Sequence, residues 1–157
     1  MSAAKLRQEA ERWYRQAEND LGAASALLKV DSYAAQSCFL AQQAAEKSLK
    51  AVGFLLDTDP WGHSCTKLIQ NLPEAEQKTF SEVLDDARAL DKLYIPTRYP
   101  DALAELTPAE AFTKQEALNA IETAQKILNC VEERIYSVSI DLPESAESEE
   151  IGPEAAQ

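Results

Sequence analysis

The chain has 157 residues, of which 45% are hydrophobic, and this fits one globular domain with a sizeable core. It contains no run of about 18 or more apolar residues, which excludes a membrane span, and we expect no secretory signal because the first residues lack an apolar stretch. The formal net charge of -12 repels phosphate at long range, which argues against DNA binding and against broad, non-specific RNA binding.

The first third of the chain predicts two long antiparallel helices. Over 3–29, apolar residues such as Leu6, Trp13 and Leu21 recur every three or four positions, the period of one buried stripe. The second helix, over 32–57, carries small and apolar residues on several sides, so we expect it to be central. One small bundle would not cover all of these sides, and exposed apolar patches mark interfaces, which predicts a homodimer.

The middle of the chain predicts a short helix near 64–72, a second helix over 75–93, and then a loop. The loop, 94–101, reads Tyr-Ile-Pro-Thr-Arg-Tyr-Pro-Asp. Its two prolines remove backbone donors and bias the preceding residues away from helix, so we expect no helix through this segment. Binding groups on a helical scaffold are often found on such loops.

The last helix is predicted over 108–138, with Thr107 as its cap and Pro108 in its first turn. Residues 139–157 contain six acidic residues, no Lys or Arg, and two prolines, so we expect an acidic, disordered tail. The predicted fold is an all-α, up-and-down antiparallel bundle over 1–138, with four long helices plus a short one, followed by this tail.

Several kinds of chemistry are disfavoured by what the sequence lacks. Cys38, Cys65 and Cys130 are odd in number and far apart, which fits packing in a reducing cytoplasm better than a disulfide or metal site. His63 is the single histidine, so a site with several histidine ligands is impossible. No glycine-rich phosphate loop or nucleophile elbow is present. We therefore expect no metal and no other cofactor.

Three groups of residues remain as candidates for function. Arg98 offers a planar fork of donors for phosphate or carboxylate, and Tyr99 a ring that stacks on a base. The structural alternative pairs Arg98 with a carboxylate of the bundle or loop, namely Asp20, Glu46 or Asp101.

The second group is Gln43, Lys47 and Lys50, which share one helix face and offer an anion site. Their alternative is pairing with acids or extending to the surface. The third is His63 at the start of a predicted helix, where capping competes with catalysis.

These residues occur in an order that resembles the HEPN domain family. The segments that carry the resemblance are Trp13, Asp20-Leu21, Tyr33, Phe39, Gln42-Gln43-Ala44, Glu46-Lys47, Lys50-Ala51, His63 and Thr97-Arg98-Tyr99-Pro100-Asp101. The resemblance covers about residues 5–138. It implies a helical bundle, commonly a homodimer, and members that bind nucleotides or act beside a separate minimal nucleotidyltransferase. Other members resemble ribonucleases with an R-x4-6-H motif, whose histidine is absent after Arg98.

The resulting hypothesis is a dimeric module that binds a nucleotide or another phosphate-bearing ligand. Lys47, Lys50 and Arg98 would contact the phosphates through charge-assisted hydrogen bonds. Tyr99 or Trp61 would stack on the base. The remaining two candidates, Asp101 and Gln43, would orient these groups.

This hypothesis requires the loop to fold back, so that Arg98 lies against the two lysines. The alternatives are a partner of a nucleotidyltransferase in a toxin–antitoxin-like pair, and a metal-independent ribonuclease using Arg98 with His63.

Overall fold

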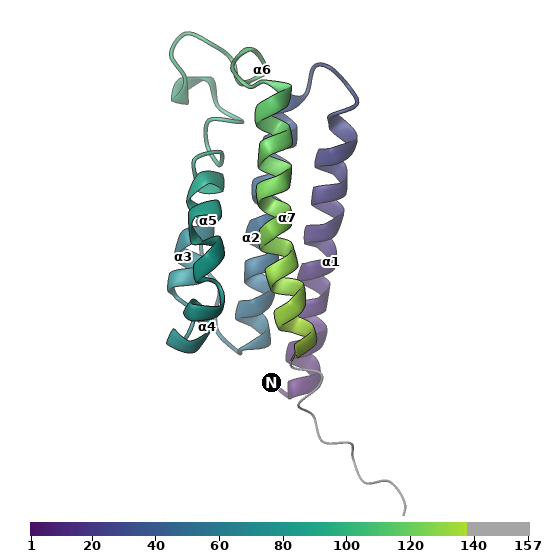
Figure 1. The fold of residues 1–157 in the computed structure, drawn as a ribbon, viewed down its shortest axis with the longest axis vertical. Coiled ribbons are helices and arrows are strands. Elements are labelled where there is room, and N and C mark those ends of the chain that lie inside the picture. The colour runs from purple at the N-terminus through teal and green to yellow at the C-terminus, as the bar shows by residue number, and fades with distance from the viewer. Residues whose placement is uncertain (138–157) are drawn as a thin grey trace, which may run out of the picture.

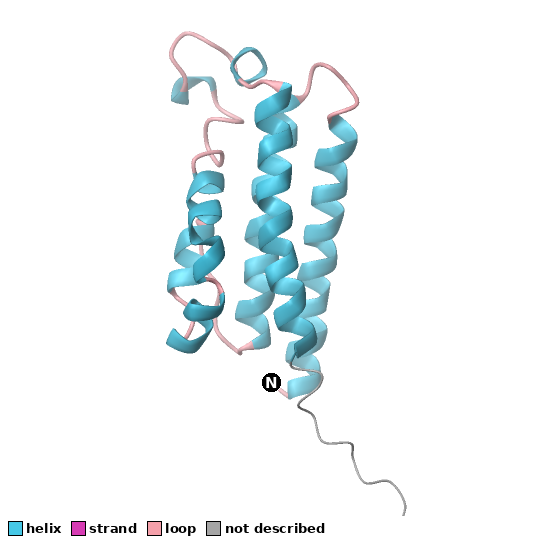
Figure 2. Ribbon diagram, viewed as in Figure 1, coloured by secondary structure: helices cyan, strands magenta, loops and turns pink. Residues whose placement is uncertain are grey.

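Long helices form the body of the computed structural model, which describes residues 1–137 (Figure 1). They are α1 (Ala3–Leu27), α2 (Ala34–Leu55) and α7 (Lys114–Ser137). The described residues contain helices and loops without a strand (Figure 2), which confirms the predicted all-α bundle. None of these helices has the length and hydropathy needed to cross a membrane. The predicted disordered tail lies outside the described residues.

The central position predicted for the second helix is confirmed. α2 packs against α1, α7 and the helices α3 (Cys65–Gln70) and α5 (Leu84–Asp91). Its small side chains allow these neighbours to come close; those with no exposed surface include Cys38, Ala41, Ala44, Ala45, Ala51 and Val52. The apolar sides of α2 are thus largely covered within one subunit. The argument for a dimer that rested on an uncovered α2 therefore no longer applies.

The fourth side of the bundle is interrupted, whereas the sequence predicted one helix over 75–93. It consists of α4 (Glu74–Thr79), a 3-10 turn η1 (Ser81–Val83) and α5. The Ser81 hydroxyl donates to the Lys78 carbonyl at 2.8 Å, a local bond that competes with helical hydrogen bonding. The tight turn brings Phe80 and Val83 onto the same side, and both are buried in the core.

A second interruption divides the helix predicted over 108–138. The short helix α6 (Pro108–Ala111) begins as predicted, because the Thr107 side chain accepts from the Glu110 amide. α7 then begins afresh with a reciprocal cap: the Thr113 amide donates to the Glu116 carboxylate at 2.8 Å, and the Glu116 amide to the Thr113 hydroxyl at 3.2 Å.

The loop between α2 and α3 is held tightly against α2. Thr58 donates from its amide and hydroxyl to the Gly53 carbonyl, at 3.0 and 2.9 Å. A Cβ atom at Gly53 would lie 2.7 Å from the Pro60 Cβ, so only glycine allows this approach. Asp91 then accepts hydrogen bonds from the Cys65 and Thr66 amides at the start of α3. These contacts fix the position of the intervening His63.

Candidate functional site

The proline-bracketed loop brings Arg98 onto α2, against three aromatic rings. The guanidinium carbon lies 4.4 Å from the Tyr94 ring centre, 4.5 Å from that of Phe39 and 5.1 Å from that of Tyr99. Its Nε donates to the Tyr94 carbonyl at 2.9 Å. This arrangement follows from the turn at 94–99, in which the Arg98 and Tyr99 amides both donate to the Ile95 carbonyl.

Arg98 makes no ion pair with a carboxylate anywhere in residues 1–137. The predicted structural alternative, pairing with Asp20, Glu46 or Asp101, is therefore not observed in this part of the chain. Cation–π contacts hold the guanidinium in place without neutralising its charge. Its two terminal nitrogens remain available as donors to an anion.

The centre of the same α2 face is organised by the buried carboxylate of Glu46. One oxygen lies 3.1 Å from the Lys50 ammonium and 3.1 Å from Nδ1 of His63. The other accepts from the side-chain amides of Gln42 and Gln43, each at 3.2 Å. Glu46 is 3% exposed, so these partners replace the water that the carboxylate gave up on folding.

His63 joins this network to Arg98. It does not take the capping role that competed with catalysis, because Ser64 caps α3 by accepting from the Lys67 amide. The imidazole stacks instead on the Tyr94 ring, with 4.9 Å between ring centres and 14° between planes. Tyr94 therefore contacts both His63 and Arg98. With its Nδ1 facing Glu46, a neutral imidazole that donates from Nδ1 keeps Nε2 as a base.

The two lysines are paired with acids, as the structural alternative predicted. Lys47 lies 2.5 Å from Asp20, and Lys50 binds Glu46. Phe39, whose ring packs against the Arg98 guanidinium, precedes Lys47 by eight residues, about 12 Å along the helix axis. Lys50 is linked to Arg98 through Glu46, His63 and Tyr94, whereas Lys47 belongs to a separate ion pair with Asp20 of α1. Asp101 is exposed.

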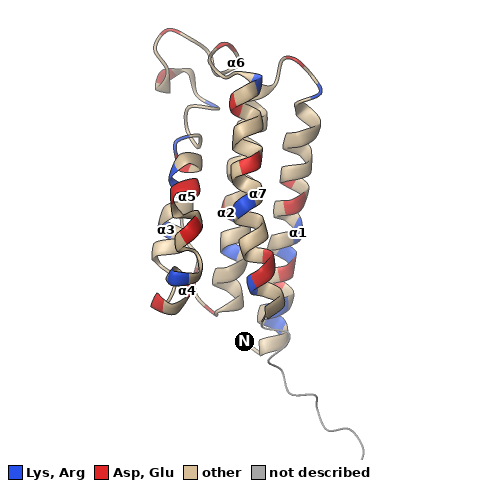
Figure 3. Ribbon diagram, in the orientation of Figure 1, with Lys and Arg blue, Asp and Glu red and all other residues tan. Residues whose placement is uncertain are grey.

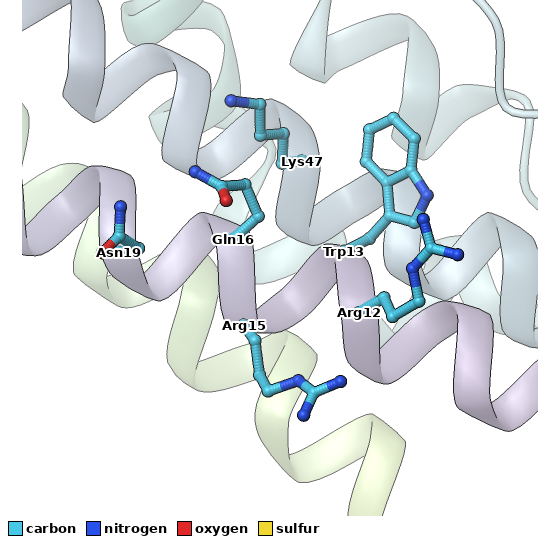
Figure 4. Close-up of a pocket in the computed structure, with 6 residues that line it drawn as sticks. All are labelled: Arg12, Trp13, Arg15, Gln16, Asn19 and Lys47. Carbon is cyan, nitrogen blue, oxygen red and sulfur yellow. The ribbon is translucent and has the colours of Figure 1, made fainter.

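A groove between α1 and α2 was not found by sequence reasoning (Figure 4). It has a volume of about 530 Å³ and is lined by Arg12, Trp13, Arg15, Gln16, Asn19 and Lys47. The lining residues on α1 recur one turn apart, and that spacing was the available signal. It was missed because charged residues on the outer face of an amphipathic helix are usually only solvated.

The cysteines are excluded as nucleophiles. Burial raises the pKa of Cys38 to about 12 and that of Cys130 to about 11, and it raises the pKa of Cys65 well above its usual value. All three are free thiols. The thiolate is the reactive form, so none of them is activated near neutral pH. Across residues 1–137, no three His, Cys, Asp or Glu side chains gather to hold a metal ion.

Comparisons with known proteins agree with the bundle and its arrangement. A family model described as HEPN domain matches residues 10–134. The protein TT1696 from Thermus thermophilus is 41% identical with a TM-score of 0.74, covering 80% of this chain and 98% of that one. ST0689, an archaeal HEPN homologue, is 37% identical with a TM-score of 0.67, covering 81% and 98%.

An HEPN domain protein from Thermotoga maritima, tm0613, is 28% identical with a TM-score of 0.58, covering 80% of this chain and 98% of its own. A search of curated proteins finds no match. The family match spans most of the bundle and includes the α2 face, His63 and Arg98. The chain therefore belongs to the HEPN domain family.

Proposed function

We propose that the protein binds a nucleotide or a similar phosphate-bearing ligand, with Arg98 as the residue that contacts phosphate. The observation that carries this proposal is the state of that guanidinium: three rings orient it, and no carboxylate within residues 1–137 neutralises it. An oriented guanidinium loses little conformational freedom on binding and offers two parallel hydrogen bonds to a phosphate.

The neighbouring side chains support a base-binding role beside Arg98. Tyr99 lies against the guanidinium and is 49% exposed, so part of its ring is open to a stacking base. Trp61, the alternative stacking residue, is 85% exposed on the loop between α2 and α3 and is not among the rings that contact Arg98 within residues 1–137. Gln43 and Lys50 act through Glu46, whose position they fix. In this proposal Lys47 stays paired with Asp20 and attracts phosphate by its charge. Asp101 orients the loop.

Isothermal titration with ATP and GTP tests the proposal. The intact protein should bind at least one of them, and Arg98→Ala should weaken binding about tenfold or more, because a charge-assisted bidentate contact is lost. Arg98→Lys keeps the charge but loses the fork, and it should bind with intermediate affinity. The matched control is Arg88→Ala, which removes an exposed arginine that pairs with Asp85 on α5. Equal affinity in Arg98→Ala, or no binding by the intact protein, would contradict the proposal.

The shared contact with Tyr94 favours a metal-independent ribonuclease as a second candidate. His63 supplies a base whose Nδ1 is held by Glu46, and Arg98 supplies a cation for the phosphodiester. The chain lacks the histidine of the R-x4-6-H motif, so His63 would take that role from another loop. Labelled RNA incubated with chelator should be cleaved by the intact protein and left whole by both Arg98→Ala and His63→Ala. RNA that stays whole with the intact protein would exclude this activity.

A further inference from the structure

The groove between α1 and α2 concentrates positive charge in an acidic chain. Arg12, Arg15 and Lys47 line it, together with the amide side chains of Gln16 and Asn19. Lys47 is paired with Asp20, and Arg12 contacts Glu9 at 3.2 Å. Arg15 makes no ion pair within the described range 1–137. The groove therefore presents hydrogen-bond donors and charge that this part of the chain leaves unneutralised. The ribbon of Figure 3 shows basic and acidic residues mixed along the bundle, α1 included.

A segment of matching charge follows directly after the last described helix. Residues 139–157 carry six acidic side chains and no Lys or Arg. Half of the net charge of -12 therefore lies in these nineteen residues, since the other 138 residues contain 15 basic and 21 acidic side chains. Carboxylates spaced along a chain suit a groove lined by two guanidinium groups and an ammonium group.

The segment begins close enough to reach the groove. α7 ends beside the first turns of α1, at one end of the bundle (Figure 1). The register is fixed by the Tyr14 hydroxyl, which donates to the Leu128 carbonyl at 3.5 Å. Ser137 lies nine residues beyond Leu128, about 14 Å along the helix axis. Residues 138–157 span up to about 66 Å when extended, which exceeds the path back to Arg12 and Arg15.

We propose that this groove is an acidic-peptide site and that its occupant is the segment 139–157 of the same chain. Attachment to α7 keeps the segment at high effective concentration, so a few screened ion pairs are enough to populate the bound state. The proposal does not require ligand binding at Arg98: the groove shares only Lys47 with the proposed phosphate site, and the variants below leave Lys47 and Arg98 unchanged.

Site-directed spin labelling of the full chain tests it. Ser148→Cys introduces one reactive thiol, whereas the native thiols are buried with raised pKa and react slowly near neutral pH. A nitroxide at position 148 should reduce the NMR peak intensities of Arg15, Gln16 and Asn19 relative to the reduced, diamagnetic sample. The loss should disappear at about 1 M salt, where the Debye length is about 3 Å.

Paired variants separate the groove from general electrostatics. Arg12→Gln with Arg15→Gln should restore these intensities, whereas Arg88→Gln with Lys92→Gln, which removes two exposed cations at α5, should leave the loss in place. Intensity losses spread over the whole surface, or unchanged by the groove variants, would overturn the proposal. Spin-labelled protein without isotope enrichment, mixed with isotope-enriched protein without a spin label, reports contacts between copies only. Equal losses in that mixture would assign the segment to a second copy and overturn the same-chain occupant.

Discussion

Glu46 is 3% exposed and is contacted by Lys50, His63, Gln42 and Gln43, so four side chains depend on one carboxylate. The Lys50 side chain is itself only 12% exposed. Because both Glu46 and Lys50 are largely shielded from water, neither charge is stable without the other. The network is thus a unit in which removal of one member leaves the others unsatisfied, and it positions the imidazole next to Tyr94.

We expect Glu46→Ala to lower the free energy of unfolding by about 3–5 kcal/mol, because the Lys50 ammonium is left buried without a partner. Urea denaturation measures the change. The control is Asp85→Ala, which removes an exposed carboxylate paired with Arg88 and should cost less than about 1 kcal/mol. Similar losses for the two variants would contradict the role given to Glu46.

At the scale of elements, the short helix α4 depends on one side chain from α7. Arg134 donates from Nε and Nη2 to the two Glu76 oxygens, at 2.7 and 2.5 Å, and both side chains are less than one-fifth exposed. The hydrogen bond that Arg134 donates to Glu76 is the main cause of the raised pKa of Arg134. None of the residues of α4 is buried, so this clamp supplies much of its attachment.

Arg134→Met should therefore loosen α4 in particular. We expect a loss of about 2 kcal/mol, the range of hydrogen bonds to charged groups, since both oxygens of Glu76 lose their donor. Amide hydrogen exchange should accelerate over Glu74–Thr79 and stay unchanged in the centre of α1. Acceleration that is uniform over the molecule would show that the clamp stabilises the whole bundle and not this element.

The sequence predicts the long elements well and their interruptions poorly. α1 and α2 end within about two residues of their predicted bounds, because a stripe over many turns averages out local preferences. The break at Ser81 is accompanied by a hydrogen bond to the Lys78 carbonyl and that at Thr113 by a reciprocal cap with Glu116, and periodicity registers neither. A capping box at Thr113 and Glu116 was legible in the sequence, but the apolar seam of the last helix concealed it.

The candidate site was predictable only where local sequence signals locate its residues. Two prolines located the loop of Arg98, and the helical period placed Gln43, Lys47 and Lys50 on one face. Of the three ring partners of Arg98, Tyr94 and Tyr99 lie in the same loop, whereas Phe39 comes from α2, so only the folded chain shows that contact. The ligand roles of these residues remain predictions.

At the scale of the whole molecule, the buried titratable groups predict sensitivity to alkaline conditions. Burial raises the pKa of Cys38 from 9.0 to about 12 and that of Cys130 to about 11, and it raises the pKa of Tyr14. The unfolded chain releases these thiol protons near pH 9, whereas the folded chain holds them to higher pH. The stability that these groups supply is complete below about pH 9 and is lost as the pH rises through their folded values.

The free energy of unfolding should accordingly fall between pH 9 and pH 11, by about 1 kcal/mol per pH unit for each buried thiol. Urea denaturation at several pH values gives the slope. A Cys38→Ala, Cys130→Ala double variant should be less stable at pH 7 but have a shallower slope. A slope identical to that of the intact protein would contradict the link to these thiols.

The homodimer stays a prediction at this scale, and α7 is one surface that it could use. Leu118 and Tyr136 of α7 are 40% and 58% exposed, which leaves apolar area at both ends of this helix. Light scattering coupled to gel filtration should give twice the subunit mass of 17.3 kDa. A mass of one subunit at micromolar concentration would contradict the dimer.

The contact between Gly53 and Pro60 sets how closely the loop between α2 and α3 packs on α2. The loop that it seats continues through Gly62 directly into His63. A single methyl group at position 53 would wedge the loop outward and draw the imidazole off its carboxylate. The absence of a side chain at position 53 therefore helps to set the distance between His63 and Glu46.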